Sequence, residues 1–191
     1  MNYTQIKAAV LAWLHDSSAE VTALIDTFIL LAEARLNRDL EAGVLLNKTT
    51  GTFSETIPYP SDFSAIVSLH KVFSTNIYVP VLPMTLTAIH EGGQGYCLTK
   101  DGIQVSPYMT GSYELAYNAN LLSIITNTTN DIATSHPDLY IYATLIEACS
   151  WSRDEKEPDF IAKYQDILTS VNLDETKLGQ SLGMRSDFNV P

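Results

Sequence analysis

The sequence predicts an α+β fold in which N- and C-terminal helix pairs form a four-helix bundle that carries an inserted antiparallel β-rich lobe. Apolar residues recur every third or fourth position near both ends of the chain, as they do in amphipathic helices. Between the ends, short Val-, Thr- and Ser-rich runs are interrupted by proline, which indicates strands and turns. A chain of 191 residues is long enough for one core with one sizeable insertion.

Two helices are expected before the β-rich segment. Residues 3–15 place their apolar side chains on one face. Ser17 and Glu20 have the spacing of a capping box, so a second helix is expected over residues 19–41. Gly43 is the expected stop of this helix.

The second helix also carries a charged pair on its expected outer face. Arg35 and Asp39 lie four residues apart, a spacing that allows an ion pair along one helix. Such a pair would stabilise the helix by a few tenths of a kcal/mol at most.

Residues 49–118 are expected to form the β-rich lobe. The Asp-Gly dipeptide at 101–102 separates two short apolar runs, 96–99 and 103–106, and is typical of a hairpin turn that needs a positive φ. Residues 112–118 alternate between large apolar and smaller or polar side chains, as expected of a half-buried strand.

Two more helices are expected after the lobe. Residues 118–134 are polar at their end and are interpreted as a long connection. Ser135 is the expected cap of a helix over residues 137–152, and a fourth helix is expected over 158–172, where apolar residues again repeat at helical spacing. Residues 173–191 lose that regularity and are interpreted as an extended tail.

The expected domains follow from these elements. Residues 1–48 and 119–172 would form the helical bundle domain, 49–118 the inserted β-rich lobe, and 173–191 the extended C-terminal tail. The core of the bundle is expected to contain apolar and aromatic side chains from all four helices, namely Trp13, Phe28, Leu36, Leu139, Ile146, Tyr164 and Leu168.

Composition excludes several classes of protein. The net charge is −11, from 11 basic and 22 acidic residues, which argues against a nucleic-acid binder that follows phosphates with clustered Lys and Arg. The longest apolar run, residues 28–32, is far too short to span a membrane. The first residues lack the pattern of a secretory signal, so export is not expected. Cys97 and Cys149 are interpreted as buried free thiols.

No catalytic, cofactor-binding or metal-binding residue can be named from the sequence, and an enzyme is not expected. The segment 92–95 lacks the Lys-Ser/Thr pair of a nucleotide-binding loop and is interpreted as a turn. The acidic run at 154–159 is interpreted as a solvated connection. The histidines have no metal-ligand spacing to one another or to a cysteine; they are His15, His70, His90 and His136.

Several segments resemble, in the same order, the motifs of the phage head–tail adaptor (connector) family. The closest are Phe28-Ile-Leu-Leu-Ala-Glu-Ala-Arg-Leu-Asn-Arg-Asp-Leu40 and the helix start Ser135-His-Pro-Asp-Leu-Tyr140. In the family's Leu-Pro-x-Asp-Phe element this chain has Tyr59 in place of leucine. The remaining likenesses lie at residues 3–14, 103–107 and 113–118, so the resemblance covers residues 3–172.

The resemblance implies a structural virion protein that is made in the host cytoplasm and located at the head–tail junction. Such a protein forms a ring, commonly twelve-fold, that docks on the portal protein and receives the next tail component. DNA passes through the ring without specific binding, and no enzymatic activity, cofactor or membrane is implied. The acidic composition agrees, because a channel rich in Lys and Arg would retain DNA.

A second hypothesis comes from a different class of protein. The chain would then be a cytoplasmic, non-enzymatic binding module that holds a small ligand or a peptide on its β-rich lobe. In the assembled particle the tail is expected to order against a neighbouring subunit or the portal, and the alternative is a frayed terminus with no role. The contact would use apolar side chains scattered among Gly, Ser and Asn, namely Leu178, Leu182, Met184, Phe188 and Val190.

Overall fold

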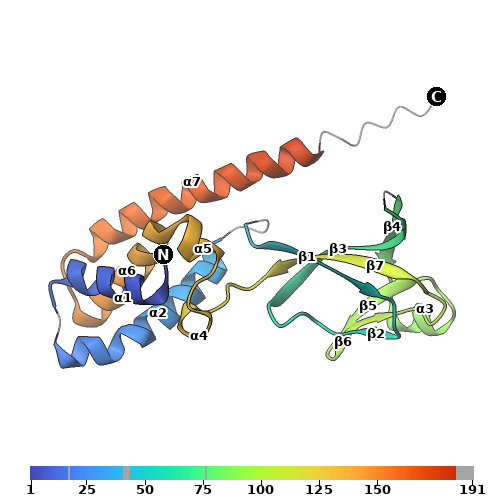
Figure 1. The fold of residues 1–191 in the computed structure, drawn as a ribbon, viewed down its shortest axis with the longest axis horizontal. Coiled ribbons are helices and arrows are strands. Elements are labelled where there is room, and N and C mark those ends of the chain that lie inside the picture. The colour runs from blue at the N-terminus through green and yellow to red at the C-terminus, as the bar shows by residue number, and fades with distance from the viewer. Residues whose placement is uncertain (17, 41–43, 76, 184–191) are drawn as a thin grey trace. The chain divides into compact units, whose positions relative to one another are not determined.

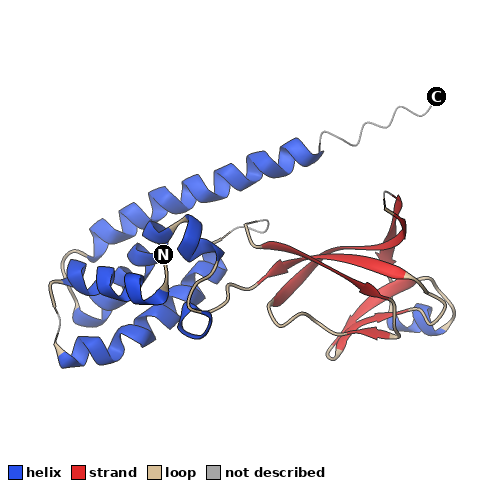
Figure 2. Ribbon diagram, in the orientation of Figure 1, coloured by secondary structure: helices blue, strands red, loops and turns tan. Residues whose placement is uncertain are grey.

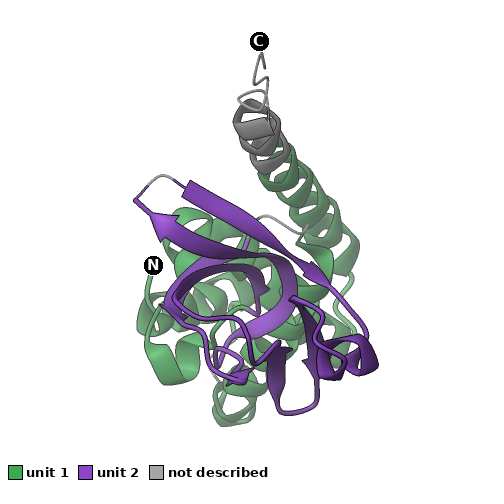
Figure 3. Cartoon of the chain, turned by 90° about the vertical axis from the view of Figure 1, so that its right-hand side faces the viewer, with its two compact units in different colours: residues 1–44, 121–191 green, residues 45–120 purple. Residues whose placement is uncertain are grey.

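The structure, a computed structural model, describes residues 1–16, 18–40, 44–75 and 77–183, with side chains up to residue 173. In this part of the chain seven helices and seven strands form an α+β structure (Figure 1). Apart from helix α3, which lies between two strands, the helices precede or follow the strands along the chain (Figure 2). Two compact units result, Met1–Val44 with Leu121–Pro191 and Leu45–Asn120 (Figure 3). We call them the helical unit and the sheet unit.

The expected four-helix bundle with an inserted antiparallel lobe is wrong. The described residues form seven helices, and their curled sheet is mixed because β4 and β5 run parallel. Two of the additional helices, α4 (Ile124–Asn127) and α5 (Asp131–Ser135), lie in the segment that was expected to be a connection. Helices this short show no apolar period, and only their capping side chains, Ser123 and Asn130, indicate them in the sequence.

The first two helices follow the expected pattern closely. Helix α1 (Tyr3–Leu14) begins at a capping box between Asn2 and Gln5. Helix α2 (Ala19–Asp39) is capped by Ser18, whose hydroxyl accepts a hydrogen bond from the Val21 N–H at 3.3 Å. The two expected boundary residues, Ser17 and Gly43, lie outside the described residues.

The C-terminal helices differ more from expectation. Helix α6 (Pro137–Ser152) begins after His136 without a side-chain cap, because Ser135 is the last residue of α5. Helix α7 (Glu157–Gly183) continues well past residue 172, so 173–183 are helical rather than extended. These residues include Glu, Lys, Leu and Gln, which favour helix even where no apolar stripe marks it.

Helix α6 is the centre of the helical unit. It contacts α1, α2, α5 and α7, which explains why its apolar residues are not confined to one stripe. Its buried side chains are Leu139, Tyr140, Ala143, Thr144, Leu145, Ile146, Ala148 and Cys149. The helical unit is therefore built around one enclosed helix rather than as four helices that share a central core.

The sheet has the strand order β1-β7-β3-β4-β5-β6-β2. All of its ladders are antiparallel except the short β4–β5 pair. Helix α3 (Leu86–His90) lies in the crossover between these two parallel strands. The strands are β1 (Leu46–Thr52), β2 (Thr56–Ile57), β3 (Phe63–Ser74), β4 (Ile77–Pro83), β5 (Gly95–Thr99), β6 (Gly102–Val105) and β7 (Ser112–Ala119).

Two expectations for the sheet unit are confirmed. Strands β5 and β6 form an antiparallel hairpin that closes at the Thr99–Gly102 pair. Gly102 has a φ of +150°, and a Cβ there would lie 2.5 Å from the Ile57 carbonyl oxygen, so the turn requires glycine. Strand β7 buries alternate large side chains, including Tyr113 and Leu115.

Most of the expected core of the helical unit is buried, but Trp13 is not. Phe28, Leu36, Leu139, Ile146 and Tyr164 are buried, and Leu168 is half-buried. The Trp13 side chain is 44% exposed and packs edge-on against the rings of Tyr142 and Phe160. A tryptophan ring is large enough to cover such neighbours while one side stays in water, so helical spacing alone could not place it.

Candidate functional surfaces

The described residues offer no evident centre for chemistry. No group of three or more His, Cys, Asp or Glu side chains in this part of the chain could hold a metal ion. Both cysteines are free; Cys149 is buried as expected, whereas Cys97 is half-buried. Burial, aided by the nearby Asp154 and Glu157 carboxylates, raises the pKa of the Cys149 thiol to about 11. That thiol is therefore protonated at neutral pH and a poor nucleophile.

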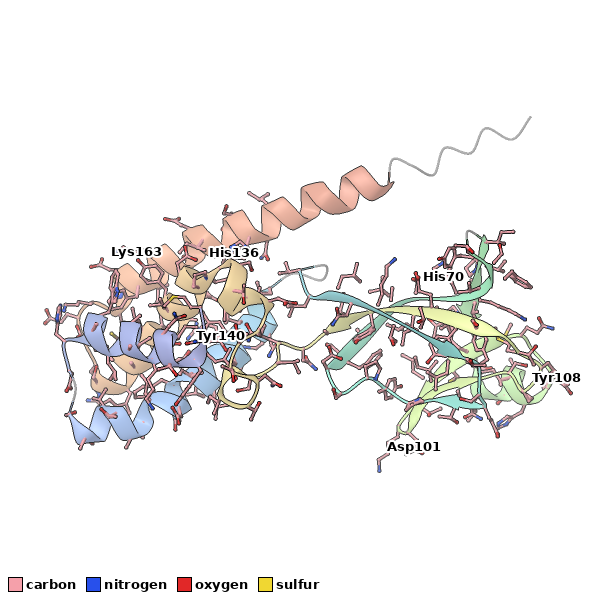
Figure 4. All side chains as sticks on the ribbon, in the orientation of Figure 1. His70, Asp101, Tyr108, His136, Tyr140 and Lys163 are labelled. Carbon is pink, nitrogen blue, oxygen red and sulfur yellow. The ribbon has the colours of Figure 1, made fainter. Side chains whose placement is uncertain are left out.

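Polar residues of the 28–40 segment fix helix α2 to the chain that returns from the sheet unit. Glu33 is buried, and its Oε1 accepts hydrogen bonds from the Ile124 N–H at 2.8 Å and from the Tyr140 hydroxyl. Burial and the adjacent carboxylate both raise the pKa of Tyr140, so its hydroxyl remains a donor. Figure 4 shows Tyr140 inside the helical unit.

The same face of α2 holds a second point of the returning chain. Asn37, one turn after Glu33, accepts a hydrogen bond from the Leu121 N–H at 2.7 Å. Residues four apart on a helix lie on the same face, so Glu33 and Asn37 together satisfy two backbone donors between residues 121 and 124. This explains why the segment needs polar side chains at these two positions.

Arg35 and Asp39 lie on a neighbouring face and bind α6 and α7. The Arg35 guanidinium pairs with the Glu147 carboxylate at 2.7 Å, and Asp39 accepts a hydrogen bond from the Tyr164 hydroxyl at 2.8 Å. The expected pair between Arg35 and Asp39 is therefore wrong. Their i, i+4 spacing was visible in the sequence, but each side chain has a partner more than a hundred residues away.

One pocket of the helical unit combines aromatic and acidic side chains. It has a volume of about 120 Å³ and lies where the α1–α2 turn meets the end of α6. The rings of Phe28 and Trp151, 5.8 Å apart, form part of its lining, and Trp151 is 46% exposed. The pocket, which we call the acidic pocket, is lined by Leu14, Asp16, Val21, Phe28, Ala148, Trp151, Ser152 and Asp154.

The two carboxylates of the acidic pocket also hold local turns. Asp16 accepts a hydrogen bond from the Ser18 N–H at 2.8 Å, and Asp154 accepts one from the Lys156 N–H at 2.9 Å. Neither takes part in an ion pair among the described residues. The pocket therefore presents negative charge above an apolar floor, a combination that suits a Lys or Arg side chain.

The β3–β4 hairpin of the sheet unit exposes an apolar surface. In Figure 1 and Figure 3 the two strands of the hairpin extend away from the rest of that unit. His70 lies on β3 within the hairpin (Figure 4), and its ring meets the edge of the Tyr78 ring across the strands. We define the hairpin surface by its exposed large apolar side chains, namely Val67, Phe73, Ile77, Tyr78, Val79 and Leu82.

The expected partner-contact residues of the tail fall at the edge of the described chain. Leu178 and Leu182 belong to helix α7, but their side chains are not among those described. Met184, Phe188 and Val190 lie outside the described residues. Contact through these five residues therefore stays a prediction.

Comparison with protein families gives a match over almost the whole chain. A protein-family model described as SU10 adaptor protein matches residues 1–185. The matched range includes all seven described helices and the whole sheet unit. No curated protein matches the chain.

Proposed function

We propose, from the premise that the chain belongs to the SU10 adaptor protein family, that it forms a ring between the portal and the next tail component of a phage. The membership confirms the resemblance to phage adaptor proteins. It makes the chain a structural adaptor protein of a phage virion that associates with other virion components. The proposal rests on the match over residues 1–185, which takes in both compact units.

The charge of the chain supports passage of DNA through such a ring. The net charge is −11, and three of the eleven basic residues are paired with carboxylates in the described part, namely Lys7, Arg35 and Lys48. The chain has twice as many acidic as basic residues, so its overall charge repels phosphates and DNA would pass the ring without specific binding. The expected number of copies in the ring, commonly twelve, is what the resemblance to phage adaptor proteins implies.

The proposed location is the head–tail junction of the virion, reached after synthesis in the host cytoplasm. Among the described residues, no helix is both long and apolar enough to cross a membrane. The exposed apolar side chains of the hairpin surface and the acidic pocket are candidates for contacts with other virion proteins.

Assembly with the portal tests this function. The purified chain, mixed with the portal protein of the same phage, is expected to form a complex whose mass fits one portal and one ring of copies. Native mass spectrometry and electron microscopy of the mixture would measure it, with portal alone and an unrelated acidic protein as controls. A chain that stays monomeric beside the portal would contradict the proposal and favour the cytoplasmic binding module.

Truncation tests the proposed contact of the tail with the portal. Deleting residues 174–191 is expected to abolish attachment to the portal, because burial of the five apolar side chains would contribute about 25 cal/mol per Å² of apolar area. The melting temperature should stay close to that of the full chain, since Val171, in α7, precedes the deletion and is buried. Co-sedimentation with portal and a thermal melt measure the two effects.

A shorter deletion is the matched control for this truncation. Removing residues 184–191 keeps all of α7 and deletes Met184, Phe188 and Val190. A loss of attachment in both variants assigns the contact to the last eight positions, whereas a loss only in the longer deletion assigns it to the end of α7. Unchanged attachment in both would show that the docking surface lies elsewhere.

A further inference from the structure

The apolar hairpin surface exists because the β3–β4 hairpin is longer than the core beneath it. Leu69 and Val81 are opposite each other in the ladder, and both are buried. On β4 the same face continues toward the tip with Val79 and Ile77, which are 45% and 56% exposed. The other face exposes Leu82 and Tyr78 at 62% and 46%. Both faces of β4 therefore present apolar side chains to solvent.

This segment is also free of acidic residues in an otherwise acidic chain. No Asp or Glu occurs from residue 63 to residue 90, although the chain has 22 of them. The cation of the hairpin is Lys71, whose ammonium lies 5.0 Å from the centre of the Phe73 ring. No ion pair of the described residues involves Lys71. The hairpin thus offers an aromatic ring and an available positive charge next to each other.

The acidic pocket has the complementary chemistry. Trp151 is half exposed at its rim, and the carboxylates of Asp16 and Asp154 line it. A lysine that entered it would meet two carboxylates, and a phenyl ring beside that lysine would meet an indole. A second copy of the chain supplies this pairing, because every copy carries both surfaces.

We propose that the hairpin surface of one copy docks on the acidic pocket of the next copy, with Lys71 toward Asp16 and Asp154 and Phe73 against Trp151. The contact joins two different surfaces, so repeating it generates a ring where the rotation closes. This inference rests on the proposed function, because it names the contact by which copies of the adaptor associate.

Charge also determines where a second copy can approach. Two chains of net charge −11 repel each other, and they can approach most easily where one of them lacks carboxylates. Large apolar side chains exposed on both faces of one strand, as on β4, are typical of an interaction site. A single contact through one hairpin is weak, and closure of a ring would reinforce it.

Disulfide trapping tests the contact directly. The variant Lys71→Cys/Ser152→Cys, in a Cys97→Ser background, is expected to give a ladder of multimers on a non-reducing gel when copies are assembled on the portal. Ser152 is chosen because it lines the pocket, and Cys149 can stay because its thiol is buried. Each single variant should give dimers at most, because one accessible cysteine per chain, beside the buried Cys149, cannot link a third copy.

The outcomes separate the contact from the function. Absence of a ladder, while the wild-type chain still forms rings on the portal, overturns the proposed contact and leaves the adaptor function standing. A wild-type chain that fails to assemble on the portal at all overturns both.

Surface variants give a second measurement. Phe73→Ser is expected to weaken association between copies about tenfold, as the loss of a central aromatic contact does, without changing the melting temperature, because Phe73 is 63% exposed. Leu98→Ser is the matched control, since Leu98 is 48% exposed on strand β5, outside the hairpin. If Phe73→Ser leaves the rings intact but prevents attachment of the next tail component, the hairpin serves a different protein and the proposal is wrong.

Discussion

Replacement of Glu33 by alanine is expected to lower the free energy of unfolding by about 3–5 kcal/mol, which would make it one of the most damaging single changes in the chain. The carboxylate is buried and accepts two hydrogen bonds, from the Ile124 N–H and the Tyr140 hydroxyl. Alanine leaves both buried donors without this acceptor, and each unsatisfied group costs about 1–3 kcal/mol. Urea unfolding followed by far-UV circular dichroism measures the effect.

Two conservative variants separate the parts of this contact. Glu33→Gln keeps an oxygen acceptor for both donors and should cost only about 1 kcal/mol. Tyr140→Phe removes one donor and leaves the bond to Ile124, so it should cost about 1–3 kcal/mol. In the double variant Glu33→Ala/Tyr140→Phe the two effects should not add, because the residues share one hydrogen bond. Strict additivity, or a small effect of Glu33→Ala, would show that this carboxylate does not hold the returning chain.

The second large effect is expected for Tyr164→Ala, which should lower the free energy of unfolding by about 3–5 kcal/mol. Tyr164 is buried on α7, and its hydroxyl donates to the Asp39 carboxylate at 2.8 Å. The substitution leaves a cavity and also removes one of the hydrogen bonds between α7 and the end of α2. Burial and the Asp39 carboxylate raise the pKa of Tyr164, so this effect should be constant across neutral pH. A thermal or urea melt measures the loss.

Matched variants show which part of Tyr164 matters. Tyr164→Phe keeps the ring and should cost only about 1–3 kcal/mol. Phe28→Ala should reach the same range as Tyr164→Ala, about 3–5 kcal/mol, because a buried ring is lost there too. Tyr108→Ala is the surface control, since Tyr108 is 70% exposed. A melting temperature of Tyr164→Ala within a degree of the parent would contradict its role in the core.

The sequence by itself determined the long elements and the family. The apolar period predicted both bounds of α1 and α6 and the start of α2 to within two residues. The expected end of α2, residue 41, lies outside the described part. The Asp-Gly dipeptide predicted the β5–β6 hairpin, since few residues other than glycine adopt the required φ. These features depend on a side chain and its near neighbours, which a sequence pattern records. The family resemblance likewise depended on short sequence motifs and on their order along the chain.

Only the tertiary structure decided what each element packs against. The parallel β4–β5 pair and the exposure of Trp13 have no local signal in the sequence, and the short helices α4 and α5 have only their capping residues. The same holds for Arg35 and Asp39, whose spacing suggested a pair with each other but whose partners are on α6 and α7. Hydrogen bonds and ion pairs form between groups that the folded chain brings together. Residues more than a hundred positions apart meet only once the helices around α6 have packed, so local spacing could not assign them.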